Sequence, residues 1–177
     1  MERGGLTNAT VELPRLLLAS RDARPRPDAE IGGVLLHDVG LLDVIRLSAA
    51  GTLPVAVDAD TVEGLAPDEA AIAFLVERLR LPIVITRRPA LAARAGALGC
   101  VALLHVHGLD STGWERAMAA HPGPPVGTAV SPGLILTHLD AEQLRSLPRP
   151  VLAYGLIRRS TERDAAFAAG ADSVVVS

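Results

Sequence analysis

The chain has 177 residues and a net charge of −3, and 49% of its residues are apolar whereas only 2% are aromatic. This charge excludes an overall basic field for nucleic acid, and the single cysteine, Cys100, excludes an internal disulfide and a cysteine-based metal cluster. Residues 1–10 lack the apolar stretch of a secretory signal, and no apolar run approaches the ~20 residues that span a bilayer, so we expect a cytoplasmic protein without membrane contact.

Short runs of β-forming residues alternate with segments of helical pattern along the whole chain. With so few aromatic residues the core must consist of Ala, Val, Leu and Ile, which suits a parallel sheet covered by helices. The predicted strands are residues 15–19, 33–37, 55–59, 83–86, 101–106, 126–130, 151–154 and 173–176. We expect a single domain over residues 1–177, with a flexible N-terminal segment at residues 1–12.

Helix-start and helix-stop residues mark several of the intervening segments. A Pro-Asp-Glu sequence at residues 67–69 opens one helix, and Gly99 and Gly170 close two others. The predicted helices cover residues 67–79, 90–98, 140–147 and 160–169, and a further helix begins at Asp110 and Ser111. Residues 20–30, with two prolines, predict a loop or a single turn.

Eight strand–helix units favour closure into a barrel over an open sheet. We therefore predict an α/β fold, a small single-domain (β/α)8-type TIM barrel. Because 177 residues fall below the ~200 that such barrels usually need, some helices must be short or missing. A doubly wound open sheet is the alternative.

Polar residues follow the apolar strands at their carboxyl ends, where (β/α)8 barrels place their functional sites. In chain order they are Ser20, Arg21, His37, Asp38, Asp58, Asp60, Thr86, Arg87, Arg88, His105, His107, Ser131, Gly155, Arg158 and Ser177. Because neighbours along a strand point to opposite faces, only one of Arg87 and Arg88 is expected to face a ligand.

The last two units, residues 151–177, have the pattern of a phosphate site. A strand runs into Gly155, whose backbone N–H can approach a phosphate, and Arg158 can add a charge-assisted contact. Ser177 directly follows the final strand on the same side, and we expect it to take part in binding the phosphate. The alternative is an ordinary turn glycine and a solvated arginine.

Two pairs of residues at strand ends suggest that the same end of the barrel could bind a metal ion. Asp58 and Asp60 would place two carboxylates on one side if their strand continued through both, and His105 and His107 would do the same with two imidazoles. With His37 and Asp38 they suit a divalent metal. We favour the alternative, a polar rim hydrogen-bonded to loops, and predict no metal, no cofactor and no catalytic residue.

Taken in order, the motifs resemble the glycerol-3-phosphate responsive antiterminator family, the regulators of glycerol uptake operons. The motifs lie at residues 57–65, 86–87, 99, 109–111, 131–133, 155–158 and 168–171. The resemblance implies a cytosolic barrel that binds glycerol 3-phosphate and acts on the leader of a nascent mRNA to prevent termination. It implies that Gly155 and Arg158 hold phosphate; from their chemistry, we expect Arg87 to face the ligand and Asp60 to meet the glycerol hydroxyls.

Some positions depart from the family pattern. The fifth strand ends in Leu104-His105 where the family has Gln-Arg, and Ala129 takes the place of a Glu ahead of Pro-Gly. Tyr154 takes the place of the first glycine of a Gly-Gly pair, and Asp58 that of a His. These departures bear on ligand and RNA binding rather than on the fold.

The leading prediction is a non-catalytic regulator that responds to glycerol 3-phosphate, or a similar small phosphate ester, and acts through leader mRNA. The alternatives are a phosphate-binding barrel enzyme, of the metal-assisted isomerase or epimerase type, and a degenerate barrel without ligand sensing. RNA contact needs cations aimed at phosphates. The candidate clusters are Arg21, Arg24 and Arg26, and Arg158, Arg159 and Arg163, although a solvated surface is the simpler interpretation. The oligomeric state is not predicted.

Overall fold

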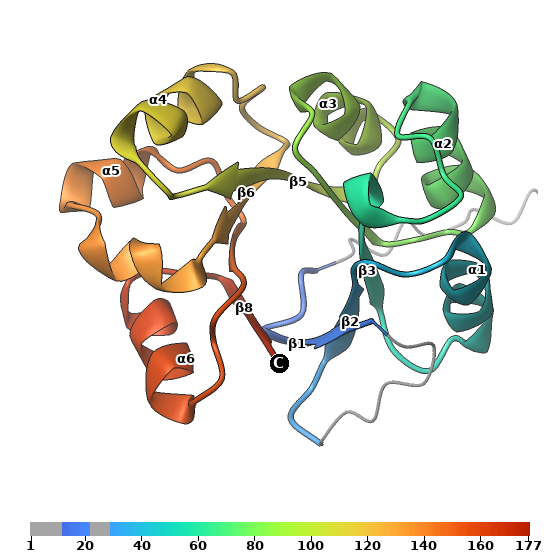
Figure 1. The fold of residues 1–177 in the computed structure, drawn as a ribbon, viewed down its shortest axis with the longest axis horizontal. Helices are drawn as coiled ribbons and strands as arrows, with labels where there is room; N and C mark the ends of the chain where they lie inside the picture. The colour runs from blue at the N-terminus through green and yellow to red at the C-terminus, as the bar shows by residue number, and fades with distance from the viewer. Residues whose placement is uncertain (1–11, 22–28) are drawn as a thin grey trace, which may run out of the picture.

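The structure is a computed structural model that describes residues 12–21 and 29–177, and these residues form a closed barrel of parallel strands (Figure 1). Each strand pairs with the next in chain order and β8 pairs with β1, so the sheet has no free edge. The strands are β1 (Leu16–Ser20), β2 (Gly33–Leu36), β3 (Val55–Asp58), β4 (Ile83–Thr86), β5 (Val101–His107), β6 (Gly127–Ser131), β7 (Val151–Ala153) and β8 (Ser173–Val176). The predicted TIM-type barrel is confirmed, and the open sheet is wrong.

All eight predicted strands form, but several end at a different residue, and two of these ends matter for the site. β3 stops at Asp58 because residues 59–61 turn into a 3-10 helix, η1 (Ala59–Thr61). β5 runs on to His107, one residue beyond the predicted end. The strand end therefore separates Asp58 from Asp60, while His105 and His107 stay on one strand.

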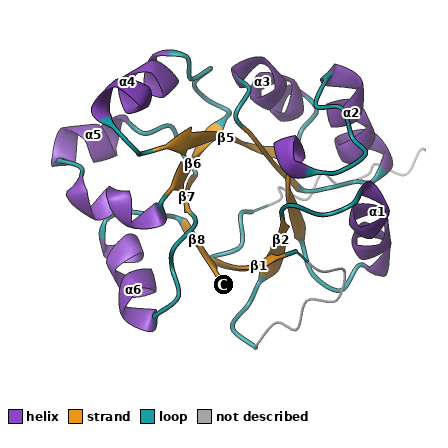
Figure 2. Ribbon diagram, viewed as in Figure 1, coloured by secondary structure: helices purple, strands orange, loops and turns teal. Residues whose placement is uncertain are grey.

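The helices lie outside the ring of strands (Figure 2). They are α1 (Leu41–Ala50), α2 (Glu69–Ala73), α3 (Pro89–Ala97), α4 (Ser111–Ala119), α5 (Ala141–Ser146) and α6 (Ser160–Ala168). The side chains of Asp68, Asp110 and Asp140 cap three of them by accepting backbone N–H groups. α2 and α5 are short, as the small size of the barrel requires.

Two helices differ from the sequence prediction. The predicted helix at residues 67–79 divides into α2 and a π-helical turn, η2 (Phe74–Arg78). α1 was not among the predicted helices because its N-cap is Gly40, which has no side chain to cap the helix and leaves no start signal in the sequence.

Two predictions fall mainly outside the described residues. The flexible segment at residues 1–12 lies there except for Glu12, and so does most of the loop predicted at residues 20–30, because residues 1–11 and 22–28 are not described. Among the described residues, no helix has the length and apolar character to cross a membrane.

The barrel interior is filled by small and medium aliphatic side chains. Alternate residues of the strands point inward and form this layer, which comprises Leu17, Leu35, Ala56, Ile83, Ile85, Leu103, Ala129, Leu152 and Val175. The outward-facing residues pack under the helices, as Val57 and Leu104 do. The aliphatic composition of the chain is therefore explained by two cores that both need compact side chains.

The inward-facing positions change from apolar to polar at the carboxyl ends of the strands. Two residues beyond each interior residue the side chain points inward again, one layer higher. This step leads from Ala56 to Asp58 on β3, from Leu103 to His105 on β5, from Ala129 to Ser131 on β6 and from Leu152 to Tyr154 after β7. A layer of polar side chains therefore covers the apolar interior layer of the barrel at the carboxyl ends of the strands.

Candidate functional site

A cavity of about 710 Å³ opens above this polar layer, at the carboxyl ends of the strands. Most of the residues singled out from the sequence line it: His37, Asp58, Arg87, His105, His107, Gly155, Arg158 and Ser177. Asp60 is not among the lining residues. Strands far apart in the chain therefore bring the predicted imidazoles, one aspartate and the phosphate-binding candidates into one space.

Asp58 lies on the floor of the cavity with its side chain only 2% exposed. Its Oδ1 accepts the backbone N–H of Asp60 at 3.2 Å, which fixes the carboxylate at the start of η1. Burial raises the pKa of Asp58 to about 6, because a charge is costly to remove from water. The neighbouring charge of Asp60 adds to this rise, and the hydrogen bond from its backbone N–H lowers the pKa.

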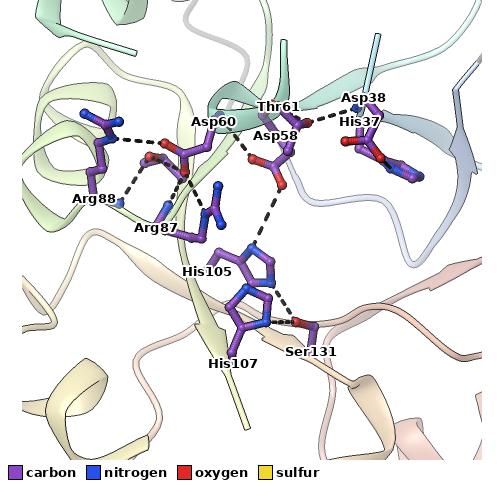
Figure 3. A network of polar contacts seen from close by, with 11 residues as sticks. His37, Asp38, Asp58, Asp60, Thr61, Arg87, Arg88, His105, His107 and Ser131 are labelled. Atoms are coloured by element: carbon purple, nitrogen blue, oxygen red, sulfur yellow. Dashed lines mark hydrogen bonds and ion pairs between the residues drawn. The ribbon is translucent and has the colours of Figure 1, made fainter. Parts of the chain in front are cut away.

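Asp58 and Asp60 do not face the same side, because β3 ends at Asp58 and the strand that this arrangement would need does not continue through both residues. η1 turns the chain after Asp58, and the Asp60 carboxylate lies against the end of β4 instead (Figure 3). Its Oδ2 accepts the Thr86 hydroxyl at 3.0 Å and the Arg87 backbone N–H at 2.5 Å. With 4% exposure Asp60 holds the β3 and β4 loops together, and its expected contact with glycerol hydroxyls stays a prediction.

Arg87 and Arg88 flank the Asp60 carboxylate from two sides. The Arg87 Nε lies 3.6 Å from Oδ2 and the Arg88 Nε lies 3.3 Å from Oδ1 (Figure 3). Both side chains are about half exposed, at 52% and 57%. Only Arg87 lines the cavity, so the carboxylate positions one guanidinium at its rim.

His105 and His107 point to the same side of β5, as their spacing predicts. Their ring centroids are 4.2 Å apart, and Ser131 on β6 joins the rings. The Ser131 Oγ lies 2.7 Å from Nε2 of His105 and 3.0 Å from Nδ1 of His107 (Figure 3). Burial lowers the pKa of His105 to about 3, so this imidazole is neutral at pH 7; burial and then Arg87 also lower the pKa of His107.

Tyr154 forms a wall of the cavity beside His105. The two ring centroids are 4.9 Å apart, and the tyrosine packs on the interior layer of the barrel. Burial, followed by the charges of Asp58 and Asp38, raises the pKa of Tyr154 to about 12. Tyr154 therefore lies on the interior layer of the barrel with its phenol protonated at pH 7.

The turn after β7 brings backbone rather than side chain to the cavity. Gly155 has φ +80° and Leu156 has φ +61°, and both line the cavity together with Ile157. The left-handed φ at position 155 suits glycine, which has no Cβ. None of the N–H groups of residues 155–157 donates to an acceptor in the described part of the chain, so these donors are available to a ligand.

Several lining residues were not predicted as ligand-binding residues from the sequence. Arg21 and Asp38, which form an ion pair of 3.2 Å at the rim, were predicted only as polar residues at strand ends and, for Arg21, as part of a candidate RNA contact. Leu156 and Thr61 also line the cavity. Leu156 gives no sequence signal, because an exposed leucine in the left-handed region depends on the path of the turn.

Four of the residues that depart from the family pattern, at positions 104, 105, 129 and 154, differ in whether they reach the cavity. Leu104 faces outward under the helices, and Ala129 belongs to the interior layer below Ser131. His105 and Tyr154, by contrast, line the cavity. Only the second pair can change what the cavity binds by direct contact.

The polar residues do not assemble into a metal site. In the described part of the chain no group of three or more His, Cys, Asp and Glu side chains is placed to hold a metal ion. Asp60 is turned away from the histidines, which removes one carboxylate from the set that the sequence suggested.

Comparisons with known proteins gave one family match and, separately, matches to solved structures. A family model described as "Glycerol-3-phosphate responsive antiterminator" matches residues 28–177. The structure resembles a glycerol uptake operon antiterminator regulatory protein from Listeria monocytogenes, with a TM-score of 0.78, 22% identity, and coverage of 94% of this chain and 95% of that one. A glycerol uptake operon antiterminator-related protein from Thermotoga maritima gives a TM-score of 0.72 and 27% identity, covering 92% and 93%.

The same barrel occurs in an enzyme. Monomers of phosphoribosylanthranilate isomerase from Thermotoga maritima match with a TM-score of 0.62, 13% identity, and coverage of 93% of this chain and 87% of that one. At this identity the match shows the fold alone. No curated protein matches the sequence.

Proposed function

Because the chain belongs to the glycerol-3-phosphate responsive antiterminator family, whose model covers residues 28–177, we propose that it is a regulator that binds glycerol 3-phosphate in the mouth of the barrel. A closely similar small phosphate ester would suit the same site. The regulator acts in the cytoplasm on the leader of a nascent mRNA that encodes glycerol-uptake functions. Ligand binding then decides whether transcription continues, without any reaction of the ligand.

The observation that carries the ligand assignment is the turn after β7. Residues 155–157 line the cavity, and their consecutive N–H groups have no acceptor among the described residues. Successive backbone N–H groups of this kind attract anions. Arg158 lines the cavity next to them and Ser177 follows β8 on the adjacent strand, so one phosphate can contact both loops.

Two backbone N–H groups between this turn and α6 already have an acceptor. The Glu162 carboxylate accepts the N–H groups of Arg158 at 2.8 Å and Arg159 at 3.0 Å. These bonds lower the pKa of Glu162 and leave the two N–H groups unavailable to a ligand. The phosphate is therefore assigned to the N–H groups of the turn and to the Arg158 guanidinium.

Three guanidinium groups at the cavity mouth support phosphate binding, although Asp38 and Asp58 also line the cavity. Arg21, Arg87 and Arg158 line it from three loops. Arg21 and Arg87 are both held by carboxylates, Asp38 and Asp60. A phosphate at the turn would meet preoriented guanidinium groups, although the chain as a whole is acidic.

Thermal unfolding with added ligand tests this function. A ligand that binds only the folded chain at 100 times its Kd stabilises it by about 2.7 kcal/mol, which corresponds to a rise in Tm of several degrees for a chain of this length. We expect glycerol 3-phosphate to produce this rise. Glycerol and inorganic phosphate at equal concentration should produce much less, because each offers only one part of the ligand.

Arg158→Ala should weaken the binding of glycerol 3-phosphate about tenfold or more, the usual effect of losing a charge-assisted hydrogen bond. Arg145→Ala, on α5 and away from the cavity, is the matched control and should bind as the wild type does. The absence of any Tm rise at millimolar glycerol 3-phosphate would contradict the ligand assignment.

Crosslinking in cells tests RNA binding separately from ligand binding. RNA crosslinked to the full chain in cells should be enriched in leaders of glycerol-uptake genes, and more so when glycerol 3-phosphate accumulates. Arg158 and Arg159 are the exposed arginines nearest the ligand turn and are our candidates for phosphate-backbone contact. Equal recovery of unrelated RNAs would contradict RNA regulation but leave ligand binding intact.

A further inference from the structure

The imidazole of His105 has one nitrogen without a partner, although it is almost fully buried. Its side chain is 3% exposed, and Nδ1 forms no hydrogen bond within the described residues. The other nitrogen, Nε2, is bonded to Ser131. A buried nitrogen without a partner is costly, so buried polar atoms in folded proteins are nearly all hydrogen-bonded. This nitrogen therefore indicates a group that binds there.

The unpartnered nitrogen faces the carboxylate of Asp58 across a gap. The distance from His105 Nδ1 to Asp58 Oδ2 is 3.9 Å, which is too long for a hydrogen bond (Figure 3). An oxygen atom placed between them can lie at a hydrogen-bonding distance of about 2.8 Å from both. The imidazole cannot swing to close the gap, because Ser131 and, through it, His107 hold the ring.

The hydrogen-bonding roles of His105 Nδ1 and the Asp58 carboxylate determine which kind of group can bridge them. In a neutral imidazole one nitrogen donates and the other accepts. If His107 donates to Ser131 and Ser131 donates to Nε2 of His105, then Nδ1 carries the hydrogen. The bridging group must accept from Nδ1 and donate to the ionised carboxylate of Asp58. An alcohol hydroxyl does both, whereas an ammonium group cannot accept and a carboxylate cannot donate.

We propose that Asp58 and His105 form a hydroxyl-binding subsite, so that the cavity selects phosphate esters that carry an alcohol group over those that do not. The proposal rests on the proposed phosphate site at the turn after β7. In the closed order of eight strands, β3 and β7 are four strands apart and so lie on opposite sides of the ring. A ligand with its phosphate on the β7 turn thus extends toward Asp58, past Tyr154.

This subsite differs from the contact expected from the sequence. Asp60 was expected to meet the glycerol hydroxyls, but its carboxylate contacts Thr86, Arg87 and Arg88. Asp58 lines the cavity and faces an unsatisfied nitrogen. Ligand selection is therefore assigned to the first aspartate of the pair.

Titration calorimetry with two ligands tests the subsite. The probes are glycerol 3-phosphate and propyl phosphate, which has the same phosphate and a three-carbon chain without hydroxyls. We expect the wild-type chain to bind glycerol 3-phosphate about 10- to 100-fold more tightly, the range for a hydrogen bond to a charged group. Asp58→Ala and His105→Phe should bind the two esters with similar affinity, because each variant lacks one side of the subsite. Asp43→Ala, on α1 beside Arg46, is the matched control and should keep the preference.

The outcomes separate the two proposals. Equal affinity of the wild-type chain for both esters would overturn the hydroxyl subsite and leave phosphate binding intact. No binding of either ester would overturn the proposed function and the subsite together. A folded Asp58→Ala variant that keeps the full preference would also overturn the subsite. The wild-type comparison needs no variant, so it decides the matter even if a substitution prevents folding.

Discussion

Asp58 keeps a carboxylate at the floor of the cavity, where burial raises its pKa to about 6. Two neighbours without formal charge, His105 and Tyr154, surround it, and the nearest guanidinium that lines the cavity is held by Asp60. The charges of Arg87 and His37 lower the pKa of Asp58, but by less than burial raises it. A residue that is costly for stability and lines a cavity is typical of a functional position.

This cost predicts that Asp58→Asn stabilises the protein in a pH-dependent way. The folded-state pKa lies above the ordinary aspartate value of 3.8, so the free energy of unfolding of the wild type falls as pH rises through about 4 to 6. The amide has no such loss and can keep the bond from Asp60 N–H. At pH 8 the variant should be more stable by up to about 3 kcal/mol, at about 1.4 kcal/mol per pH unit between the two pKa values.

Urea unfolding at pH 4, 5, 6 and 8 measures this difference, which should shrink to nearly zero at pH 4. Asp38→Asn serves as a control, because that side chain is 51% exposed and pairs with Arg21 at the rim. It should show no gain at pH 8. A loss of stability in Asp58→Asn at pH 8 would mean that the carboxylate is stabilised by its surroundings.

At the scale of the elements, register between neighbouring strands assembles the site. β5 and β6 pair with His107 opposite Ser131 and His105 opposite Ala129. This register puts one hydroxyl between two imidazoles. Sequence alone places both histidines on one face of a strand, because their spacing is two, but it contains no information on which residue of the next strand lies beside them.

The start of β6 fixes how β6 and β7 meet, and it predicts a sharp effect of Gly127→Ala. An added Cβ would overlap the carbonyl oxygen of Pro150 and lie 2.7 Å from its Cδ. Because this neighbour is backbone, the strands must shift, and we expect a loss of about 1–3 kcal/mol in the free energy of unfolding. Circular dichroism melts of the variant and the wild type measure it.

Gly96→Ala is the matched control for this substitution. Its Cβ would lie 3.5 Å from Pro125 and Val126, an ordinary contact, and alanine is favoured over glycine inside α3 by about 0.5–1 kcal/mol. Its Tm should equal or exceed that of the wild type. Equal Tm values for the two variants would show that β6 and β7 can move apart freely.

At the scale of the whole molecule, closure of the barrel depends on the last strand. β8 pairs with β7 on one side and with β1 on the other, where residues 16–18 lie opposite residues 174–176. Val174 and Val175 are buried on the two faces of the sheet. The first and last units of the chain therefore meet, and the phosphate turn and the rim around Arg21 are brought together by that contact.

Deleting residues 173–177 should abolish cooperative thermal unfolding, because it opens the ring and exposes the interior layer around Leu17 and Leu152. Binding of a hydrophobic dye at 25 °C should rise at the same time. Deleting Ser177 alone, which lies beyond β8, is the control and should keep a sharp transition. A sharp transition at the wild-type Tm in the longer deletion would show that closure is dispensable.

The sequence by itself determined the strand order, the barrel class and the family. These follow from periodicity, glycine positions and motif order, which are local properties of the chain. It also determined that His105 and His107 share a face. The tertiary structure alone decided which strand-end groups meet: η1 turns Asp60 to the arginines, the β5–β6 register places Ser131 between the histidines, and the pairing of β3 and β5 with β4 brings Asp58 close to His105. The reason is physical, because contacts across a ring depend on where each strand ends and on the register between strands, and neither is encoded within one strand.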